Sequence, residues 1–247
     1  MSALVESVKG WLNAGLGLVY PEVCQLCGEA RATPAESYVC RRCRAGVRMI
    51  QAPLCDRCGL PFQGAICSSF ECSNCKDADF HFAYARSAAV ARDPLLEVIH
   101  RYKYRQALWF EPLLGELLIT AAVPDLSGGE WDWIVPVPLH PTKHRERGFN
   151  QAERLARRLS AATGLPLRTR VLRRTAPTQT QTLLTRGERR QNVRKAFALR
   201  GRPDLENRRI VLVDDVFTTG ATTGECARVL RKSGAAEVCV WTVARGI

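Results

Sequence analysis

Paired cysteines near the N-terminus constrain this chain more than any other feature. Of its 11 cysteines, nine lie between positions 24 and 75, and eight of those nine form Cys-x-x-Cys pairs. The pairs are Cys24 with Cys27, Cys40 with Cys43, Cys55 with Cys58, and Cys72 with Cys75. Twelve residues separate the first two pairs and 13 separate the last two, a spacing typical of four-thiolate zinc sites. We predict two zinc sites in tandem, in a small double zinc-ribbon domain over residues 20–78 that follows a helical lead-in over residues 1–19.

Other interpretations of the same thiols stay open. Disulfides need an oxidising compartment, and the first 20 residues lack the basic region and cleavage site of a signal peptide. An iron–sulfur cluster also uses four thiolates. Cys67, between the pairs of the second site, could replace one of its ligands. A closed four-thiolate zinc has no open coordination position, so we expect both ions to be structural.

Beyond residue 79 the cysteine pairs give way to alternating apolar segments. These predict strands over residues 82–90, 133–138, 209–215 and 237–243, and helices over 94–105, 107–122, 149–162 and 223–233, with a loop over 124–130. Such alternation is typical of an α/β fold in which helices cover both faces of a parallel sheet. We assign this second domain to residues 79–247.

A strand that ends in two carboxylates is the chemical centre of this second domain. Asp214 and Asp215 follow four apolar residues, and a loop of hydroxyl-bearing and small residues then leads into a helix. In open parallel sheets, ligands bind beyond the carboxyl ends of the strands. Amides and hydroxyls at the start of a helix suit a phosphate monoester, and the carboxylates suit sugar hydroxyls. The expected ligand is therefore a phosphorylated ribose.

The positive charge of the chain is unevenly distributed. The net charge is +12, but residues 139–202 contain 17 Lys and Arg against 3 Asp and Glu, whereas residues 20–78 contain 7 against 6. Such a basic stretch indicates a polyanionic partner, although a solvated arginine-rich surface would look the same. Because no run reaches the roughly 18 apolar residues of a spanning helix, we expect no membrane insertion and a cytoplasmic location.

Residues 210–222 are similar to the phosphoribosyl-pyrophosphate motif of type I phosphoribosyltransferases. The chain as a whole resembles the ComF family, which is associated with DNA uptake in natural competence. The resemblance rests on the cysteine ribbons and on the motifs that follow them: Pro136-Val137-Pro138-Leu139, Arg147-Gly148-Phe149-Asn150-Gln151, and Gln181, Arg189 and Asn192 ahead of Ala196-Phe197. It implies a type I phosphoribosyltransferase fold preceded by a small tandem zinc-ribbon domain.

The resemblance also implies roles for individual residues. Asp214 and Asp215 would hold the ribose hydroxyls, and the 5′-phosphate would be bound by Thr218, Thr219, Gly220, Ala221 and Thr222. Arg145 and Arg147, in the predicted loop after strand 133–138, would bind the pyrophosphate, and Lys103 matches a lysine typical of the family. Gln181, Arg189 and Asn192 would belong to a loop over 178–194 that closes over the site, with Gln179 as a second candidate for the glutamine. Magnesium would bridge pyrophosphate and ribose oxygens.

Three functions follow from these features. The chain could transfer a phosphoribosyl group from phosphoribosyl pyrophosphate to an acceptor, bind single-stranded DNA as a competence factor, or act as a scaffold that senses phosphoribosyl pyrophosphate without turnover. DNA-uptake proteins are possible partners in each case. Phe149 and Phe197 are the only aromatic residues in the basic stretch, fewer than a stacking platform for single strands normally has. The acceptor does not follow from the sequence.

Overall fold

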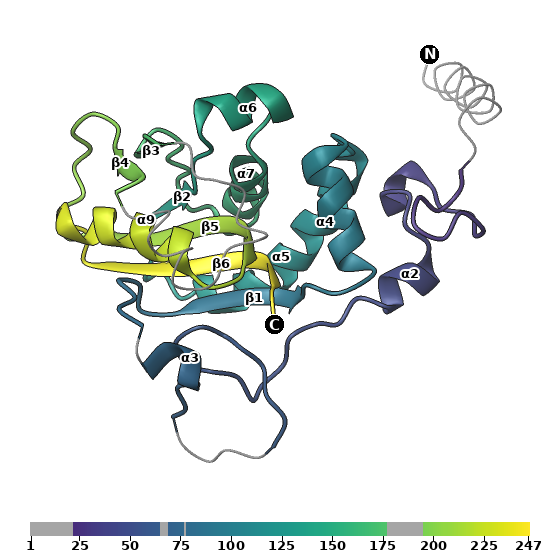
Figure 1. Cartoon of the computed structure of the whole chain (residues 1–247), viewed down its shortest axis with the longest axis horizontal. Helices are drawn as coiled ribbons and strands as arrows, with labels where there is room; N and C mark the ends of the chain where they lie inside the picture. The colour runs from purple at the N-terminus through teal and green to yellow at the C-terminus, as the bar shows by residue number, and fades with distance from the viewer. Residues whose placement is uncertain (1–21, 65–68, 77, 177–194) are drawn as a thin grey trace.

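Four parallel strands form the centre of the fold (Figure 1). The computed structural model describes residues 22–64, 69–76, 78–176 and 195–247, so the predicted lead-in over 1–19 lies outside the described part. Along the sheet the strands are β1 (Ala85–Val90), β6 (Glu237–Arg245), β5 (Arg209–Phe217) and β2 (Trp133–Pro136). Every neighbouring pair is parallel, which confirms the predicted parallel sheet.

Helices cover both faces of this sheet, as predicted (Figure 1). Helices α5 (Glu111–Leu126) and α7 (Gln151–Thr163) pack against each other and against one face, and α9 (Ala221–Lys232) covers the other. In α7 the buried apolar residues recur every three or four positions, at Ala152, Leu155, Ala156 and Leu159. That spacing gives the helix the apolar stripe it needs to pack on a sheet.

Shorter elements connect these layers. They are the 3-10 turns η1 (Pro34–Glu36) and η2 (Leu108–Phe110), the helices α2 (Arg41–Ala45), α3 (Ser73–Lys76), α4 (Leu95–Tyr104) and α6 (Pro141–Arg147), and the antiparallel pair β3 (Leu172–Arg174) and β4 (Phe197–Leu199). The β3–β4 pair was not predicted from the sequence. No helix in the described ranges is long and apolar enough to cross a membrane.

Two segments predicted as loops are helical in the structure, the first of them, 124–130, only at residues 124–126. Helix α5 continues through Pro124 to Leu126, because the buried stripe of Leu118 and Ala122 extends to Leu126 and packing there outweighs one missing N–H. The cationic segment after β2 forms α6. His140 Nδ1 accepts the N–H of the second helical residue at 3.3 Å, and Gly148 ends the helix with a φ of 79°.

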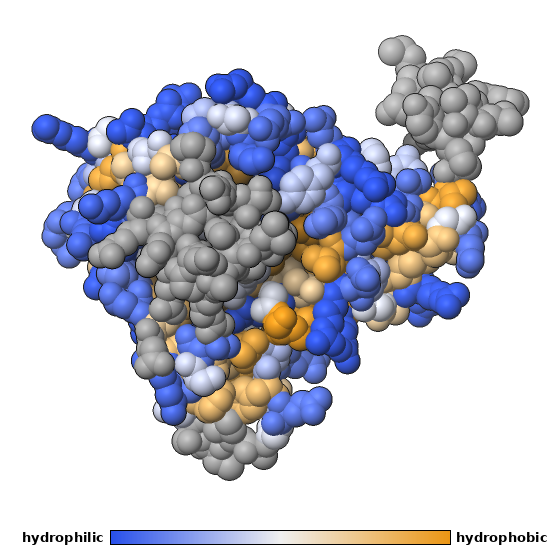
Figure 2. All heavy atoms as spheres, in the orientation of Figure 1, coloured by the Kyte–Doolittle hydropathy of each residue, from blue (hydrophilic) through white to orange (hydrophobic). Residues whose placement is uncertain are grey.

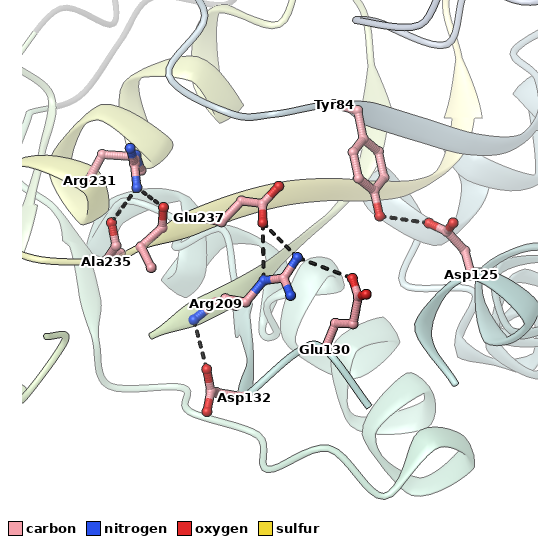
Figure 3. Close-up of polar contacts among 9 residues, drawn as sticks. Tyr84, Asp125, Glu130, Asp132, Arg209, Arg231, Ala235 and Glu237 are labelled. Atoms are coloured by element: carbon pink, nitrogen blue, oxygen red, sulfur yellow. Dashed lines mark hydrogen bonds and ion pairs between the residues drawn. The ribbon is translucent and has the colours of Figure 1, made fainter. Parts of the chain in front are cut away.

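Charged side chains join the amino-terminal ends of the strands (Figure 3). Arg209 Nη2, at the start of β5, lies 2.8 Å from Glu237 Oε2 at the start of β6 and 3.1 Å from Glu130 Oε2. The backbone N–H of Arg209 donates to Asp132 Oδ2 at 2.8 Å. These ion pairs stabilise the sheet at the end opposite to the one where ligands bind in folds of this type.

The first cysteine-rich segment, residues 24–43, attaches to the helices. Arg44 Nη1, just beyond it, pairs with Glu116 Oε2 of α5 at 2.9 Å, and Arg101 of α4 donates to the carbonyl of Gln25. Hydrophilic residues dominate the side of the molecule that carries α6, whereas hydrophobic residues gather over parts of both cysteine-rich segments (Figure 2).

The second cysteine-rich segment, residues 55–75, is continuous with the main core. Its four cysteines pack in one cluster with Phe82 and Phe217, while Cys24 and Cys40 of the first segment belong to a separate small cluster. Between the two segments, Met49 pairs with Ala89 on the outer edge of β1. The division of the chain at residue 79 stays a prediction.

Candidate functional site

The carboxyl end of β5 leads directly into the predicted sugar-phosphate segment. Asp214 and Asp215 are buried, and each Oδ1 accepts the next backbone N–H at 2.9 Å. Helix α9 begins at residue 221, and no acceptor among the described residues takes the backbone N–H groups of Thr218, Thr219 and Gly220. These donors at the start of a 12-residue helix are therefore available to an anion.

Two constraints require glycine at position 220. The residue has a φ of 74°, in the left-handed region. A Cβ atom there would also lie 2.6 Å from Cζ of Phe217 and 2.7 Å from Cε1 of Phe80. Only a residue without a side chain lets the loop lie flat on these two rings.

A cavity of about 490 Å³ adjoins this loop. Its walls come from α4, the β2–α6 connection, α6, β3 and the β5–α9 loop. The predicted site residues that it brings together are Lys103, Arg147, Asp214, Asp215, Thr218, Thr219, Gly220, Ala221 and Thr222. The lining residues come from four parts of the chain, 96–104, 137–151, 174 and 214–223, which meet at one end of the sheet.

Opposite charges face each other in the cavity. Lys103 Nζ, from α4, lies 2.5 Å from Asp215 Oδ2. Burial lowers the pKa of Lys103 to about 8, against the attraction of Asp214. Burial likewise raises the pKa of Asp214 to about 6, although Lys103, Arg174 and Arg147 oppose the shift. Burial removes water from these charged groups. A ligand with both hydroxyls and phosphates could replace that water, because its hydroxyls can donate to the carboxylates and its phosphates can pair with the cations.

Arg147 reaches the cavity from the last residue of α6. Its Nη1 donates to Gln151 Oε1 at 2.6 Å, and burial lowers its pKa. Asn150 accepts an N–H from the first turn of α7 and donates its amide to the carbonyl of Val137, each at 3.1 Å. The motif at 147–151 therefore joins α6, α7 and the end of β2 beside the cavity.

Only some cations of α6 face the cavity. Lys143 and Arg147, four residues apart, line it, whereas Arg145 is exposed and lies outside the set of lining residues. Helical spacing explains the difference, because residues four apart share a face and residues two apart do not. The sequence predicted a loop at Arg145, and in a loop this distinction cannot be made.

Arg174 lines the cavity although the sequence analysis gave it no role. It is the last residue of β3, burial lowers its pKa, and its guanidinium lies 5.3 Å from the ring centroid of Phe197 in β4. A three-residue strand is too short to show a periodic pattern. Gln181, Arg189, Asn192, the predicted closing loop over 178–194, and Cys67 lie outside the described residues.

Each group of four paired cysteines gathers its sulfurs in one place. In both groups all Sγ atoms lie within 4.8 Å of one another, and the individual contacts measure 3.6 to 3.9 Å. An ion about 2.3 Å from four tetrahedral sulfurs would separate them by about 3.8 Å. The first cluster is Cys24, Cys27, Cys40 and Cys43, and the second is Cys55, Cys58, Cys72 and Cys75. Both donor sets fit a zinc ion.

Backbone amides in the clusters favour thiolates. The N–H of Cys40 donates to Cys24 Sγ at 3.4 Å, and the N–H of Cys72 donates to Cys55 Sγ at 3.3 Å. Burial raises the pKa of the Cys24 thiol, but the surrounding N–H donors outweigh burial and bring the pKa down to about 6. Burial and the neighbouring thiols raise the pKa of Cys43 and Cys75, so without a metal only part of each cluster is ionised. A thiolate is the form that binds a metal.

Part of the basic stretch is engaged in ion pairs. Arg158 Nε lies 2.9 Å from Oε1 of the buried Glu111, and Arg154 contacts the other oxygen of the same carboxylate. Arg157 Nη2 lies 3.1 Å from Glu153 Oε1. These arginines of α7 therefore have partners within the protein.

Comparison with known proteins covers both parts of the chain. The family "Double zinc ribbon domain" matches residues 15–77, and the family "Phosphoribosyl transferase domain" matches residues 128–247. Competence protein F of Haemophilus influenzae is 32% identical over 224 residues, which cover 85% of this chain and 97% of that protein. DNA utilization protein YhgH of Escherichia coli K12 is 32% identical over 92% of this chain and 99% of its own length.

The likeness extends to a more distant relative. Competence protein ComFC of Bacillus subtilis is 29% identical over 219 residues, which cover 84% of each chain. The matched regions include both cysteine clusters and the cavity walls at the end of β5, but not the wall formed by α4. The chain therefore belongs to the ComF family, in which a double zinc ribbon precedes a domain with the type I phosphoribosyltransferase fold.

Proposed function

We propose that this chain binds phosphoribosyl pyrophosphate with Mg²⁺ and transfers the phosphoribosyl group to an acceptor, releasing pyrophosphate. One observation carries the proposal: the buried carboxylates of Asp214 and Asp215 share a cavity with the free N–H groups of residues 218–220. Carboxylates suit a sugar diol, and free amides at a helix start suit a phosphate monoester. A 5-phosphorylated ribose carries the diol at one end and the phosphate at the other.

The cations on the opposite wall suit the leaving group. In the proposed reaction the acceptor bonds to the anomeric carbon while the bond to the pyrophosphate oxygen breaks, and its electron pair leaves with pyrophosphate. Arg147, Lys143 and Lys103 line the part of the cavity built by α6 and α4. Cations that are already in place stabilise the negative charge that develops there without further reorganisation.

The carboxylates also fit a hard cation. Asp214 and Asp215 offer the oxygen ligands that Mg²⁺ prefers, and Asp215 Oδ2 already faces the ammonium of Lys103 at 2.5 Å. Magnesium, when bound, would neutralise charge between ribose and pyrophosphate oxygens.

Calorimetry with phosphoribosyl pyrophosphate and Mg²⁺ tests the binding site. We expect the double variant Asp214→Asn/Asp215→Asn to bind at least tenfold more weakly than the wild type, because both sugar-binding acceptors lose their charge. Asp204→Asn, at an exposed carboxylate outside the cavity, should bind like the wild type. Equal affinity of the double variant and the wild type would overturn the assignment.

Pyrophosphate release separates an enzyme from a sensor. The protein would be mixed with phosphoribosyl pyrophosphate, Mg²⁺ and a panel of nucleobases, amines and ammonia. Acceptor-dependent release supports transfer. Binding without release from any acceptor would favour the scaffold that senses phosphoribosyl pyrophosphate.

The relatives' names point toward DNA. Because they are called competence protein F and DNA utilization protein, we propose that this chain acts in DNA uptake. Direct binding of single-stranded DNA is the second candidate, favoured by exposed cations such as Arg168, Arg170 and Arg200. The ion-paired arginines of α7 support it less. A single-stranded oligonucleotide that binds with steep salt dependence would support this candidate.

We further propose two structural zinc ions and a cytoplasmic location. The ten cysteines in the described residues are free thiols, and eight of them form the two clusters. A reducing compartment keeps such thiols available to metal.

A further inference from the structure

Arg245, near the end of the chain, connects the second cysteine cluster to the start of the phosphate loop, which we define as residues 218–222. The residue is buried, with 3% of its surface exposed. Its Nε donates to the carbonyl of Cys58 at 3.2 Å, and its Nη2 lies 3.5 Å from Cys58 Sγ. Its Nη1 donates to the carbonyls of Phe217 at 3.2 Å and Thr218 at 2.7 Å. One planar side chain therefore touches a predicted zinc ligand and two successive peptide units.

These contacts, together with the N–H of Gly246, which donates to the carbonyl of Phe217 at 2.8 Å, fix the direction of the anion-binding amides. In a trans peptide unit the carbonyl and the following N–H point in opposite directions. Because the carbonyls of Phe217 and Thr218 point at Arg245, the N–H groups of Thr218 and Thr219 point away from it. Those N–H groups are among the donors without an acceptor in the described residues, and both residues line the cavity.

The charge of Arg245 needs compensation that the sheet does not supply. Among the described residues no carboxylate lies within ion-pair distance of this guanidinium, and its nearest ring is that of Phe217, with a centroid 4.8 Å away. A buried cation without a counter-charge is costly. Four thiolates around a zinc ion carry a net negative charge, and Cys58 presents one of these sulfurs to Arg245. Hydrogen bonds to metal ligands of this kind orient both partners.

A second connection runs beside the first. Arg57, within the second cysteine-rich segment, donates from Nη2 to the carbonyl of Phe80 at 2.6 Å. The ring of Phe80 is one of the two rings that leave no space for a side chain at Gly220. The cysteine-rich segment thus supports the phosphate loop at its start, through Arg245, and at its middle, through Phe80.

We propose that Arg245 is a positioning residue for the phosphate loop, and that through Arg245 the metal-loaded second cluster sets the affinity of this loop for a 5′-phosphate. The identity of the ligand rests on the proposed function. The coupling itself rests only on the contacts of Arg245.

The test compares Arg245→Lys with Arg86→Lys. Lysine keeps the charge at position 245 but lacks the planar guanidinium group, which contacts Cys58 on one side and the phosphate loop on the other. Arg86 is the matched control, because its Nη1 donates to the carbonyl of Asp56 at 2.8 Å in the same cysteine-rich segment but has no contact with the phosphate loop. Three quantities are measured: zinc per chain, NMR order parameters of the backbone N–H groups of residues 217–222 without ligand, and calorimetric affinity for phosphoribosyl pyrophosphate with Mg²⁺.

We expect Arg245→Lys to retain two zinc ions, to lower the order parameters of the loop N–H groups from about 0.85, the value of rigid backbone, to below about 0.6, and to bind at least tenfold more weakly, while Arg86→Lys matches the wild type. A folded Arg245→Lys with wild-type order parameters and affinity overturns the proposal. If Arg245→Lys does not fold, Cys75→Ser, which breaks the second cluster but spares Cys58, is compared instead, with the N–H groups of β2 as the reference for a general loss of stability. Wild-type order parameters of the loop in that variant, or an equal decrease in the loop and in β2, overturn the proposal as well. If the wild type itself does not bind phosphoribosyl pyrophosphate, the proposed function fails, whereas the order parameters still decide the role of Arg245.

Discussion

At neutral pH the buried charge of Asp214 lowers the stability of the folded protein. Burial raises its pKa from an ordinary value of 3.8 to about 6, so the folded state favours the neutral acid. The stability that this group contributes is fully present below about pH 4 and is lost as the pH rises through 6. We therefore expect Asp214→Asn to raise the free energy of unfolding at pH 7.5 by about 1–3 kcal/mol, and by less at pH 5.5. Urea unfolding at both pH values measures the difference, with exposed Asp204→Asn as the control. An Asp214→Asn variant no more stable than the wild type at pH 7.5 would contradict this account.

Single residues differ in how far the sequence predicts their place. Asp214 and Asp215 belong to a continuous motif, so the strand that carries them also positions them, and both line the cavity. Arg174 and Arg245 act through contacts with residues distant in the chain; Arg245 and Cys58, for example, are 187 positions apart. No local pattern distinguishes such an arginine from an exposed one, because only the folded chain creates its partners.

The turn between β5 and α9 depends on a glycine for two separable reasons. Gly220 and Gly201 have the same φ of 74°, but a Cβ at Gly201 would meet nothing within 4 Å, whereas one at Gly220 would meet two rings below 3 Å. We expect Gly201→Ala to cost about 1 kcal/mol through backbone strain alone. Gly220→Ala should cost at least 1 kcal/mol more and weaken phosphoribosyl-pyrophosphate binding at least tenfold, because the loop must move off the rings. Thermal unfolding and calorimetry measure both effects. Equal losses of stability in the two variants would mean that the rings of Phe80 and Phe217 move aside at no cost in free energy.

Elements with a buried apolar run or stripe followed from the sequence, and elements without one did not. Apolar runs and helical periodicity predicted the four sheet strands and helices α4, α7 and α9, whose buried faces extend over many residues. Helix α6 has no buried residue, so its sequence lacks the periodicity that identifies a helix, and only its capping residues mark it. The β3–β4 pair is only three residues long in each strand and forms by pairing across distant parts of the chain.

At the scale of the whole molecule, two clusters with nearly the same spacing have different surroundings. By spacing alone the two clusters form a tandem repeat, because the gaps of 12 and 13 residues differ by only one position. In the structure all four cysteines of the second cluster are buried in the main core, beside Phe217 at the end of β5. The first cluster contacts α4 and α5 through Arg101 and Arg44. Spacing predicts the metal sites, whereas only packing shows that the second cluster lies in one core with Phe217, a residue that lines the cavity.

This difference predicts unequal consequences when equivalent ligands are removed. Cys40 and Cys72 each begin the second pair of a cluster, and each donates its N–H to a sulfur of the first pair. We expect Cys40→Ser to lose one zinc ion and leave the affinity for phosphoribosyl pyrophosphate within about twofold, because only Cys43 of the first cluster packs against the core of the sheet, on the face that α5 and α7 cover. Cys72→Ser should also lose one zinc ion, but it should lower the free energy of unfolding of the entire domain by at least about 3 kcal/mol, because its cluster is part of that core. Zinc content, urea unfolding and calorimetry on the two variants make the comparison. Equal global destabilisation by both substitutions would mean that the two clusters stabilise the domain in the same way.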